Sequence, residues 1–405
     1  MTKSSSTKAF LFILIFLTSS SNFAQFVTVK GKEFYSSDGK PLFLKGINLG
    51  NWLLPEGYMF KFQKTSSPRL IFEMVNQLVG EDEARKFWNA FYDEYITHED
   101  IKFIKAAGFN SIRLPFNYKL FVNPNDHLKI EGKGFELIDR CVKWCKEKNL
   151  YVIFDMHGAP GGQTGDNIDD SYGYPFLYED EDAQQTTILI WKKIAEIYKD
   201  EPIVIGYDLL NEPIAHYFDK DKLNPLLVPL FKKITKSIRE VDNNHIIFFG
   251  GAQWNSNFSV FAEPFDDKAV YTFHKYWTDT TQSVIQEYVD YSNKYNVPLW
   301  MGESGENTNE WITSFRKLLE VNNISWCFWP YKKMDAPSNV VSVSKPNNWD
   351  LILKYSEADR SSYSSIRENR PDINIIRPIL AEYLENIKFK NCIINSDYLK
   401  ALGLK

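Results

Sequence analysis

The amino-acid sequence predicts an α/β protein built as a (β/α)8 TIM barrel with extended loops after its strands. Eight short apolar segments recur along the 405 residues, and helical patterns fill most of the gaps between them. Strands that alternate with helices form parallel sheets, and eight such units close naturally into a barrel. An open doubly wound sheet is the main alternative, but it usually has a glycine-rich phosphate turn after its first strand. Gly46, Gly50 and Gly57 do not form that fingerprint.

The eight expected strands are short and largely apolar, because strands of a parallel barrel are buried on both faces. The run Tyr151-Val152-Ile153-Phe154 is typical. We expect strands at residues 42–48, 111–116, 151–156, 203–210, 246–249, 270–274, 298–302 and 325–329. A further strand-like segment at 26–35 precedes them, and Asp38-Gly39 marks a tight turn before the first barrel strand.

Helical patterns lie between most of these strands. The first clear one begins at Thr97, which forms a capping-box-like pair with Asp100, and ends at Gly108, a typical C-cap residue. We expect helices at 97–108, 135–148, 186–199, 226–241, 284–295, 308–321 and 376–387. Segments 157–183 and 332–371 are longer than a barrel needs and are predicted insertions, and 388–405 is expected to be a short helix or a loose tail.

The N-terminus has the features of a secretory signal. Lys3 and Lys8 precede a nine-residue apolar run, which is too short to span a bilayer, and small residues follow it. Cleavage after Ala24 divides the chain into a signal peptide, 1–24, and a single catalytic domain, 25–405. We therefore expect a secreted or periplasmic monomer with no membrane span. Secretion permits disulfides, but the sequence does not pair Cys141, Cys145, Cys327 and Cys392.

Composition narrows the class of ligand. A formal charge of −5, from 47 Lys and Arg against 52 Asp and Glu, argues against a nucleic-acid partner, which requires a basic face. Aromatic residues make up 16% of the chain, and it has 11 Trp. A large aromatic core accounts for most of them, and stacking platforms for flat ligands such as sugar rings are a further explanation.

Polar residues gather where the expected strands end, which is where a barrel of this kind has its chemistry. Glu212 follows the fourth strand and Glu303 follows the seventh. Two facing carboxyl groups suit glycoside hydrolysis, because one protonates the leaving oxygen while the other attacks the anomeric carbon. The other residues at these ends are Arg113, Asp155, His157, Asn211, His274, Tyr276 and Trp329.

These residues carry a resemblance to a known family. Asn211-Glu212-Pro213 and Gly302-Glu303-Ser304 resemble the motifs of glycoside hydrolase family 5, the cellulase family, over nearly the whole mature chain. The resemblance implies a TIM barrel with Glu212 as acid/base and Glu303 as nucleophile. It also implies a substrate-binding set of Arg113, His157, Asn211, His274, Tyr276 and Trp329, with no metal and no cofactor.

Elementary chemistry fits these implied roles. Glu212 must hold its proton near neutral pH, which requires burial or a nearby negative charge. Glu303 must be ionised, and Arg113 and Tyr276 can supply a charge and a hydroxyl. Asn211 can bond the sugar 2-hydroxyl, and the two histidines can donate to sugar hydroxyls or hold a carboxylate. Trp329 can form the floor under the sugar ring.

A second resemblance is narrower. His157-Gly158-Ala159-Pro160-Gly161-Gly162-Gln163, and Leu49-Gly50-Asn51-Trp52-Leu53 with Glu56, resemble the exo-β-1,3-glucanase branch of the family. The expected activity is therefore retaining hydrolysis of β-glucosidic bonds in a β-glucan or its oligosaccharides. A transglycosylase using the same covalent intermediate, a carbohydrate-binding barrel without catalysis, and a metal-dependent hydrolase using Asp155, His157 and His274 remain alternatives.

Overall fold

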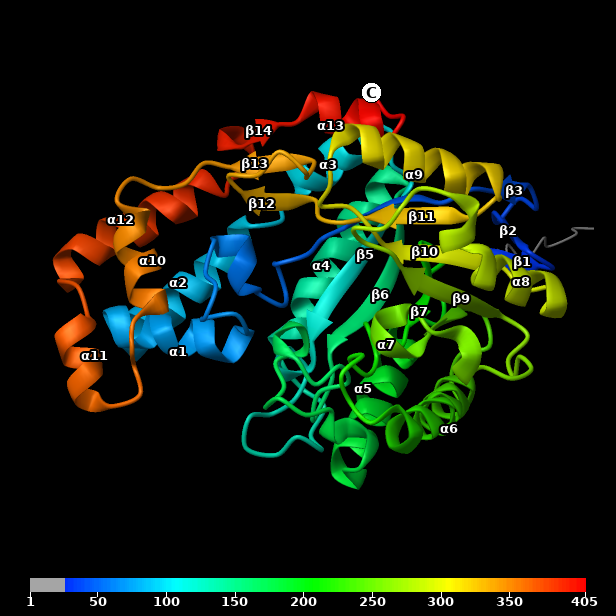
Figure 1. The fold of residues 1–405 in the computed structure, drawn as a ribbon, viewed down its shortest axis with the longest axis horizontal. Coiled ribbons are helices and arrows are strands. Elements are labelled where there is room, and N and C mark those ends of the chain that lie inside the picture. Colours follow the sequence, from blue (N-terminus) through cyan, green and yellow to red (C-terminus); the bar gives the residue numbers. More distant parts are fainter. Residues whose placement is uncertain (1–25) are drawn as a thin grey trace, which may run out of the picture.

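Eight parallel strands close into a barrel at the centre of the molecule (Figure 1). The computed structural model describes residues 26–405, so the predicted signal segment lies outside the described residues. The barrel strands, in chain order, are β4 (Lys45–Asn48), β5 (Ser111–Asn117), β6 (Tyr151–Gly158), β7 (Val204–Asp208), β8 (Ile246–Gly250), β9 (Ala269–His274), β10 (Leu299–Glu303) and β11 (Ser325–Phe328). The sheet closes where β11 pairs with β4, so the predicted (β/α)8 barrel is confirmed.

The first expected strand is divided in two. Residues 42–48 were expected to form one strand, but β3 (Pro41–Leu42) pairs with β2 (Glu33–Tyr35), and only β4 joins the barrel. The expected strand at 26–35 is likewise a hairpin of β1 (Thr28–Lys30) and β2, because Gly31 turns the chain at a φ of 57°. Both corrections have one cause: the N-terminal residues pair with each other and not with the barrel.

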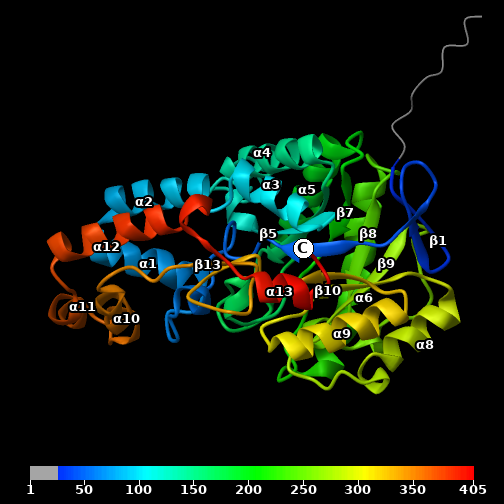
Figure 2. The ribbon, with the colours of Figure 1, turned by 90° about the horizontal axis from the view of Figure 1, so that it is seen from above.

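This small sheet covers the end of the barrel at which the strands begin. Phe34 of β2 stacks on Phe248 of β8, with ring centroids 6.5 Å apart. Val27 and Leu44 are buried in the same cluster, together with Trp300 of β10. Figures 1 and 2 show β1 at one end of the molecule and the helices α10–α12 at the opposite end. The carboxyl ends of the strands therefore remain uncovered by this sheet.

Most of the barrel helices lie where the sequence predicts them. They are α3 (His98–Ala107), α4 (Lys133–Lys148), α5 (Glu181–Tyr198), α6 (Lys220–Arg239), α8 (Gln286–Tyr295) and α9 (Asn309–Val321). The predicted capping box of Thr97 and Asp100 begins α3, and Gly108 ends it. The C-terminal residues form a short helix, α13 (Ser396–Ala401), which packs against α9.

A helical lobe projects from the barrel and is the main feature that the sequence did not predict. It consists of α1 (Pro68–Val79), α2 (Glu81–Glu94), α10 (Trp349–Glu357), α11 (Tyr363–Asn369) and α12 (Ile373–Asn386). The helix expected at 376–387 is α12, but it packs on α1 and α2 of the lobe and not on the barrel (Figures 1 and 2).

Aromatic stacking explains the position of α12. Tyr383 stacks on Phe91 of α2 and on Trp349 of α10, with centroids 6.4 and 5.2 Å apart. A helix with a large aromatic residue on its apolar face buries that face wherever matching aromatic side chains exist, and here they lie in the lobe.

A second small sheet joins the lobe to the barrel. It consists of β12 (Lys332–Met334), β13 (Val341–Val343) and β14 (Ile393–Ile394). Together with α10 and α11, it shows that the predicted insertion at 332–371 has secondary structure of its own. The division into a single domain over 25–405 stays a prediction. Within residues 26–405, no helix is long and apolar enough to cross a membrane.

Candidate active site

The two predicted catalytic glutamates lie at the carboxyl ends of the fourth and seventh barrel strands. Glu303 is the last residue of β10, and Glu212 lies four residues beyond the end of β7. Glu212 has a left-handed backbone, with a φ of 46°, which is a strained conformation for a residue other than glycine.

The loop after β6 holds this strained backbone in place. The Thr164 hydroxyl donates to the Glu212 carbonyl at 2.8 Å, and the Gln163 amide donates to the Asn211 carbonyl at 2.8 Å. The buried Asp169 carboxylate orders the loop in turn, because it accepts the backbone N–H of Thr164 at 2.6 Å. Segment 164–170, which had no assigned role in the sequence, therefore supports the position of Glu212.

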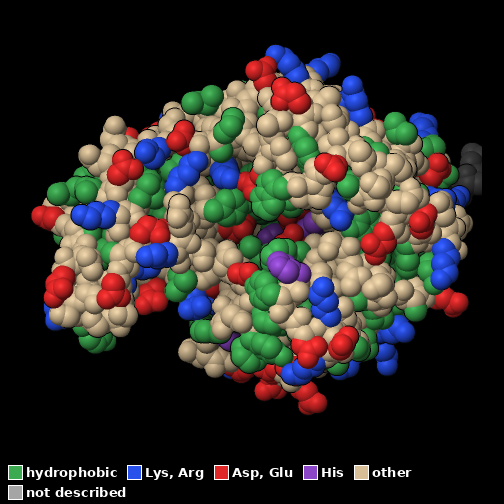
Figure 3. Space-filling view, viewed as in Figure 1, with side chains coloured by type: hydrophobic (Ala, Val, Ile, Leu, Met, Phe, Trp, Pro, Cys, Tyr) green, Lys and Arg blue, Asp and Glu red, His purple; other side chains and the backbone are tan. Residues whose placement is uncertain are grey.

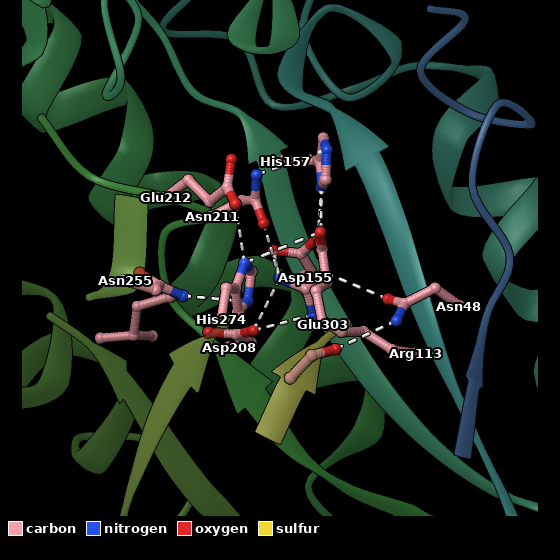
Figure 4. A network of polar contacts seen from close by, with 12 residues as sticks. Asn48, Arg113, Asp155, His157, Asp208, Asn211, Glu212, Asn255, His274 and Glu303 are labelled. Atoms are coloured by element: carbon pink, nitrogen blue, oxygen red, sulfur yellow. Dashed lines mark hydrogen bonds and ion pairs between the residues drawn. The ribbon is translucent and has the colours of Figure 1, made fainter. Parts of the chain in front are cut away.

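His274 brings the two glutamates together (Figure 4). Its Nδ1 lies 3.0 Å from Glu212 Oε1 and 3.6 Å from Glu303 Oε2. One carboxylate oxygen of each glutamate lies within 4.8 Å of the other. The side chain of Glu212 is 15% exposed and that of Glu303 is 6% exposed, so both carboxyl groups are largely shielded from water yet reachable from it.

Arg113 on β5 is the centre of the polar network below the glutamates (Figure 4). Its guanidinium is fully buried and pairs with Glu303 Oε1. It also lies 2.9 Å from Asp208 Oδ2 and 3.0 Å from Asp155 Oδ1. One buried cation therefore faces three carboxyl groups, and Asn211 Oδ1 accepts a further N–H from it at 2.9 Å.

Burial and mutual repulsion raise the pKa values of the acidic groups. For Glu212, burial is the main cause and the neighbouring Glu303 charge is the second, and together they hold its pKa well above the usual range. Burial also raises the pKa of Glu303, but the Arg113 guanidinium opposes that effect. We therefore expect Glu212 to retain a proton at a pH at which Glu303 has lost its own.

Burial also raises the pKa values of the two aspartates that lie below the glutamates, Asp155 and Asp208. Both pKa values rise to about 7, although the Arg113 charge acts in the opposite direction. Burial lowers the pKa of His157 to about 3 and that of His274 well below its usual value. Both imidazoles are therefore neutral at pH 7 and act as hydrogen-bonding groups.

The remaining predicted residues also lie around this pair. The Tyr276 hydroxyl donates to Glu303 Oε2 at 3.1 Å. The Asn211 amide lies 3.4 Å from His157 Nε2, whose Nδ1 lies 2.8 Å from Asp155. Trp329 stacks on the His157 ring, with centroids 5.5 Å apart and planes 7° apart. All eight predicted site residues are thus brought together at one end of the barrel.

Several residues of the network did not follow from the sequence analysis. Asn48, the last residue of β4, accepts an Arg113 N–H at 3.1 Å. Asn255 donates to His274 Nε2 at 3.1 Å, which leaves Nδ1–H of that ring to face Glu212. Asn48 also ends the strand expected at 42–48, and that position was a signal available in the sequence. Asp208 ends β7 but lies inside the strand expected at 203–210, so no such signal marked it. Asn255 gave none, because it belongs to a short irregular segment.

Glu56 is a further acidic residue of this region. It belongs to the sequence segment that resembles the β-1,3-glucanase branch, and its side chain is buried. Burial raises its pKa well above the usual range, and the Glu303 charge adds to that effect. The backbone N–H of Glu56 donates to Asn51 Oδ1 at 2.9 Å, so the loop after β4 is fixed by its own side chains.

Two groups of three residues place metal-ligand atoms within 4.8 Å of one another: Asp155 with His157 and Glu303, and Glu212 with His274 and Glu303. The set considered for a metal-dependent hydrolase, Asp155, His157 and His274, is divided between them. In the first group the Arg113 guanidinium contacts both carboxylates, so a protein cation already supplies the positive charge there.

Comparison with known proteins agrees with this geometry. A model of the family described as cellulase (glycosyl hydrolase family 5) matches residues 62–335, which is more than half of the chain. A β-xylosidase of Phanerodontia chrysosporium is 27% identical over 81% of this chain and 75% of its own length. A glucan 1,3-β-glucosidase of Lachancea kluyveri is 34% identical over 50% of this chain and 49% of its own length.

Solved structures share the fold. Thermotoga maritima Cel5A in complex with cellobiose covers 89% of this chain and 97% of its own, with a TM-score of 0.53 and 19% identity. An endogalactoceramidase covers 75% and 74%, with a TM-score of 0.57 and 19% identity. With the barrel, the paired glutamates and the family match in agreement, the chain belongs to glycosyl hydrolase family 5 and is a hydrolase of glycosidic bonds.

Proposed function

We propose that this protein is a retaining glycoside hydrolase that cleaves β-glucosidic bonds in a β-glucan or its oligosaccharides by double displacement. The observation that carries the proposal is the close approach of the two glutamates: one carboxylate oxygen of Glu212 lies within 4.8 Å of one carboxylate oxygen of Glu303. Retaining enzymes need carboxyl groups about 5–5.5 Å apart, whereas inverting enzymes need about 6.5–9.5 Å to admit a water molecule. The short spacing favours retention.

The electrostatics support one division of roles within the pair. Glu303 pairs with Arg113 and accepts the Tyr276 hydroxyl, so it is the group better suited to be ionised and to attack the anomeric carbon. Glu212 has the more strongly raised pKa and is the proton donor to the leaving oxygen. When Glu303 forms the covalent bond, its charge is lost and the pKa of Glu212 falls, which suits its second role as a base.

The surrounding side chains have supporting roles in this proposal. His274 holds Glu212 through Nδ1, and Asn255 fixes the tautomer that makes this possible. Asn211 is held by Arg113 and His157, which leaves its amide able to bond the sugar 2-hydroxyl. Trp329 offers an aromatic surface next to His157. No residue in this scheme requires a metal or a cofactor.

The proposed sugar and glycosidic linkage of the substrate are inferred from the sequence relatives. The glucan 1,3-β-glucosidase of Lachancea kluyveri and the loops after β4 and β6 favour a β-1,3-glucan. An endoglucanase C of Acetivibrio thermocellus, 27% identical over 72% of this chain and 92% of its own length, keeps β-1,4-glucans among the candidates. The predicted signal segment is consistent with action on an extracellular polysaccharide.

A substrate screen with analysis of the released anomer tests the proposal. Soluble β-1,3-, β-1,4- and mixed-linkage glucans and mannan are incubated with the enzyme, and proton NMR follows the first anomer released. We expect a β-glucan to be cleaved with the β-anomer appearing first. Release of the α-anomer first would contradict the retaining mechanism.

Variants with a matched control identify the catalytic pair. Glu212→Gln and Glu303→Gln should each lower kcat by at least about 1000-fold, because each removes one half of the double displacement. Glu368→Gln, the same change on an exposed residue of α11, should retain normal activity. Wild-type turnover by either of the first two variants, with folding verified by circular dichroism, would exclude these roles.

A further inference from the structure

One buried aspartate, Asp170, joins the helical lobe to the loop that supports Glu212. It lies in the loop after β6, has a left-handed backbone with a φ of 61°, and its side chain is 1% exposed. Figure 3 shows a hollow beside the lobe, with acidic and histidine side chains inside it. The lobe is therefore a neighbour of the site, and Asp170 is one of the points at which the two are connected.

Asp170 caps the lobe helix α1 from outside the helix. α1 begins at Pro68, and its N-cap residue Ser67 makes no side-chain capping hydrogen bond. Asp170 Oδ1 instead accepts the backbone N–H of Arg69, the second residue of the helix, at 2.7 Å. The first N–H groups of a helix have no partner within it and carry a partial positive charge, so a carboxylate is favourable there. The start of the lobe is thus completed by the loop after β6.

Two further contacts hold the same place together. Asp170 Oδ2 lies 2.6 Å from the ammonium of Lys119, which follows β5. The Arg69 guanidinium donates to the Ser171 carbonyl at 3.3 Å and lies over the Tyr172 ring, 4.3 Å from its centroid. The lobe, the end of β5 and the loop after β6 therefore meet at one buried carboxylate. We call Asp170, Arg69 and Lys119 the lobe joint.

A short chain of hydrogen bonds leads from the lobe joint to Glu212. Asp169, which precedes Asp170, accepts the backbone N–H of Thr164 at 2.6 Å. The Thr164 carbonyl accepts the N–H of Ala215 at 2.9 Å, and its hydroxyl donates to the Glu212 carbonyl at 2.8 Å. The strained backbone of Glu212 is thus held by a loop whose other end is fixed to the lobe.

Proton transfer is sensitive to the position of the acid. The acid must lie within hydrogen-bonding distance of the glycosidic oxygen, and a misplacement of about 1 Å can cost about 100-fold in rate. A strained backbone keeps its conformation only while its surroundings enforce it. We propose that Asp170 is a positioning residue for Glu212, because it fixes the loop after β6 to α1 and so keeps the Glu212 carboxyl group in place. This inference rests on the proposed function, because it takes Glu212 as the acid.

The consequence is specific to substrates that need the acid. In the first step the Glu303 carboxylate bonds to the anomeric carbon, the bond to the leaving oxygen breaks, and the Glu212 proton passes to that oxygen. A sugar requires this proton to leave, whereas 2,4-dinitrophenolate is stable as an anion and leaves without it. In the second step water bonds to the carbon, Glu212 takes a proton from the water, and the bond to Glu303 breaks, whichever group has left.

The test therefore compares two leaving groups. The wild type, Asp170→Ala, Asp170→Asn and Lys119→Met are assayed on the glucan oligosaccharide that the wild type cleaves best and on the 2,4-dinitrophenyl β-glycoside of the same glycosyl unit. Asp372→Ala is the matched control, because Asp372 caps the lobe helix α12 and accepts the Asn374 N–H at 2.9 Å. Thermal unfolding and circular dichroism verify folding.

For Asp170→Ala we expect kcat/KM on the oligosaccharide to fall by about 10- to 100-fold, because Glu212 no longer lies at the glycosidic oxygen. On the dinitrophenyl glycoside, kcat/KM should change by less than about threefold, since this parameter reports only the first step. There kcat and KM should fall together, because the second step still needs Glu212 as a base. Added azide, a nucleophile that needs no base, should restore kcat. Asp372→Ala should match the wild type on both substrates.

The other two variants separate the contacts of the lobe joint. In Asp170→Asn the side-chain carbonyl can still accept the Arg69 N–H, and Lys119→Met leaves that bond intact, so each removes only the ion pair. Each should show the same pattern at a smaller size, about 3- to 10-fold on the oligosaccharide. The double variant Asp170→Asn/Lys119→Met should lose no more than either one. Because the Lys119 side chain is 40% exposed, Lys119→Met should fold even if Asp170→Ala does not.

Each other outcome has a definite meaning. Equal losses on both substrates in the folded variants, or no loss on the oligosaccharide, would overturn the role of Asp170 and leave the proposed function intact. Glu212→Gln on the same two substrates separates the two proposals. Equal losses in that variant would show that Glu212 is not the acid, and would overturn the proposed function itself.

Discussion

Two buried cations, Arg113 in the barrel and Lys332 at the start of β12, show how differently one protein can neutralise a buried charge. Arg113 faces Asp155, Asp208 and Glu303, so carboxyl groups outnumber the cation three to one. Lys332 faces a single carboxylate, Asp100, at 2.7 Å.

The rest of the Lys332 environment is neutral and complete. Its ammonium donates to the carbonyls of Tyr95 and Ile387 at 2.6 and 3.0 Å, and the Tyr331 hydroxyl donates to Asp100. Lys332 therefore joins the end of the lobe helix α12 to the cap of the barrel helix α3. In the Arg113 cluster, by contrast, carboxyl groups are in excess. Burial is the main cause of their raised pKa values, and for Glu212 the neighbouring Glu303 charge adds to it.

The comparison leads us to expect different consequences when each cation is replaced: loss of stability at the balanced Lys332 pair and loss of turnover at the Arg113 cluster. Replacing Arg113 should mainly lower turnover, and replacing Lys332 should mainly lower stability. The predictions below measure that separation.

Among the substitutions that test this comparison, Arg113→Lys should have the largest effect, and that effect should be on catalysis. A lysine retains the charge, but a single ammonium cannot replace the planar guanidinium that contacts Glu303, Asp155 and Asp208 together. We expect kcat to fall by at least about 100-fold, because Glu303 loses its fixed position. Steady-state kinetics on the best glucan substrate measure this. A kcat near that of the wild type in a folded variant would refute the assigned role of Arg113.

Lys332→Met should have its effect on stability. It leaves Asp100 buried without its cation, and we expect the free energy of unfolding to fall by about 3–5 kcal/mol. Urea unfolding measures the loss, while kcat of the folded enzyme should change by less than about twofold. The double variant Lys332→Met/Asp100→Asn should regain part of the loss. A large fall in kcat with unchanged stability would reverse the comparison.

Asp208→Asn should have the smallest effect, and that effect should depend on pH. The pKa of Asp208 is raised from 3.8 to about 7 in the folded state, chiefly by burial, so folded protein binds a proton that unfolded protein has released. Its contribution to stability is present below about pH 4 and is lost as the pH rises through 7.

The asparagine variant does not undergo this loss. Relative to the wild type, its free energy of unfolding should therefore rise by roughly 1–3 kcal/mol between pH 5 and pH 8. Urea titrations at unit pH intervals give the difference. A difference that stays constant over this range would show that Asp208 does not titrate as its burial indicates.

The barrel and the glutamate pair could be predicted because local signals determine them. A short apolar run such as 151–156 predicts a strand that is buried in a parallel barrel. The residues that follow each run then lie at the end of the barrel where the strands terminate. Glu212 and Glu303 follow two such runs. Closure of the sheet into a barrel is therefore sufficient to bring them to the same end of the molecule. The same reasoning leads to Arg113, His157 and His274, whose side chains lie around the two glutamates in the structure.

The helical lobe could not be predicted in the same way. The pattern of α12 shows an apolar face, but the sequence does not say which surface that face covers. Tyr383 packs on Phe91 and Trp349, and only the folded chain brings these residues together. Asn255 was missed for a different reason, since a left-handed run of three ordinary residues contradicts their local preferences and exists only because its surroundings enforce it.

The lobe has a consequence for how the protein is made. Its helices α1 and α2 leave the ribosome first, yet α10 and α12, which cover their aromatic faces, follow only after some 250 further residues. At ordinary rates of synthesis that interval is on the order of tens of seconds. During this time Phe91 can pack on early neighbours such as Phe60 but lacks its contact with Tyr383, so the nascent chain exposes apolar surface until α12 has been translated. Removing the C-terminal residues that include α12 should therefore lower the yield of folded protein, although this segment does not belong to the site around the glutamates.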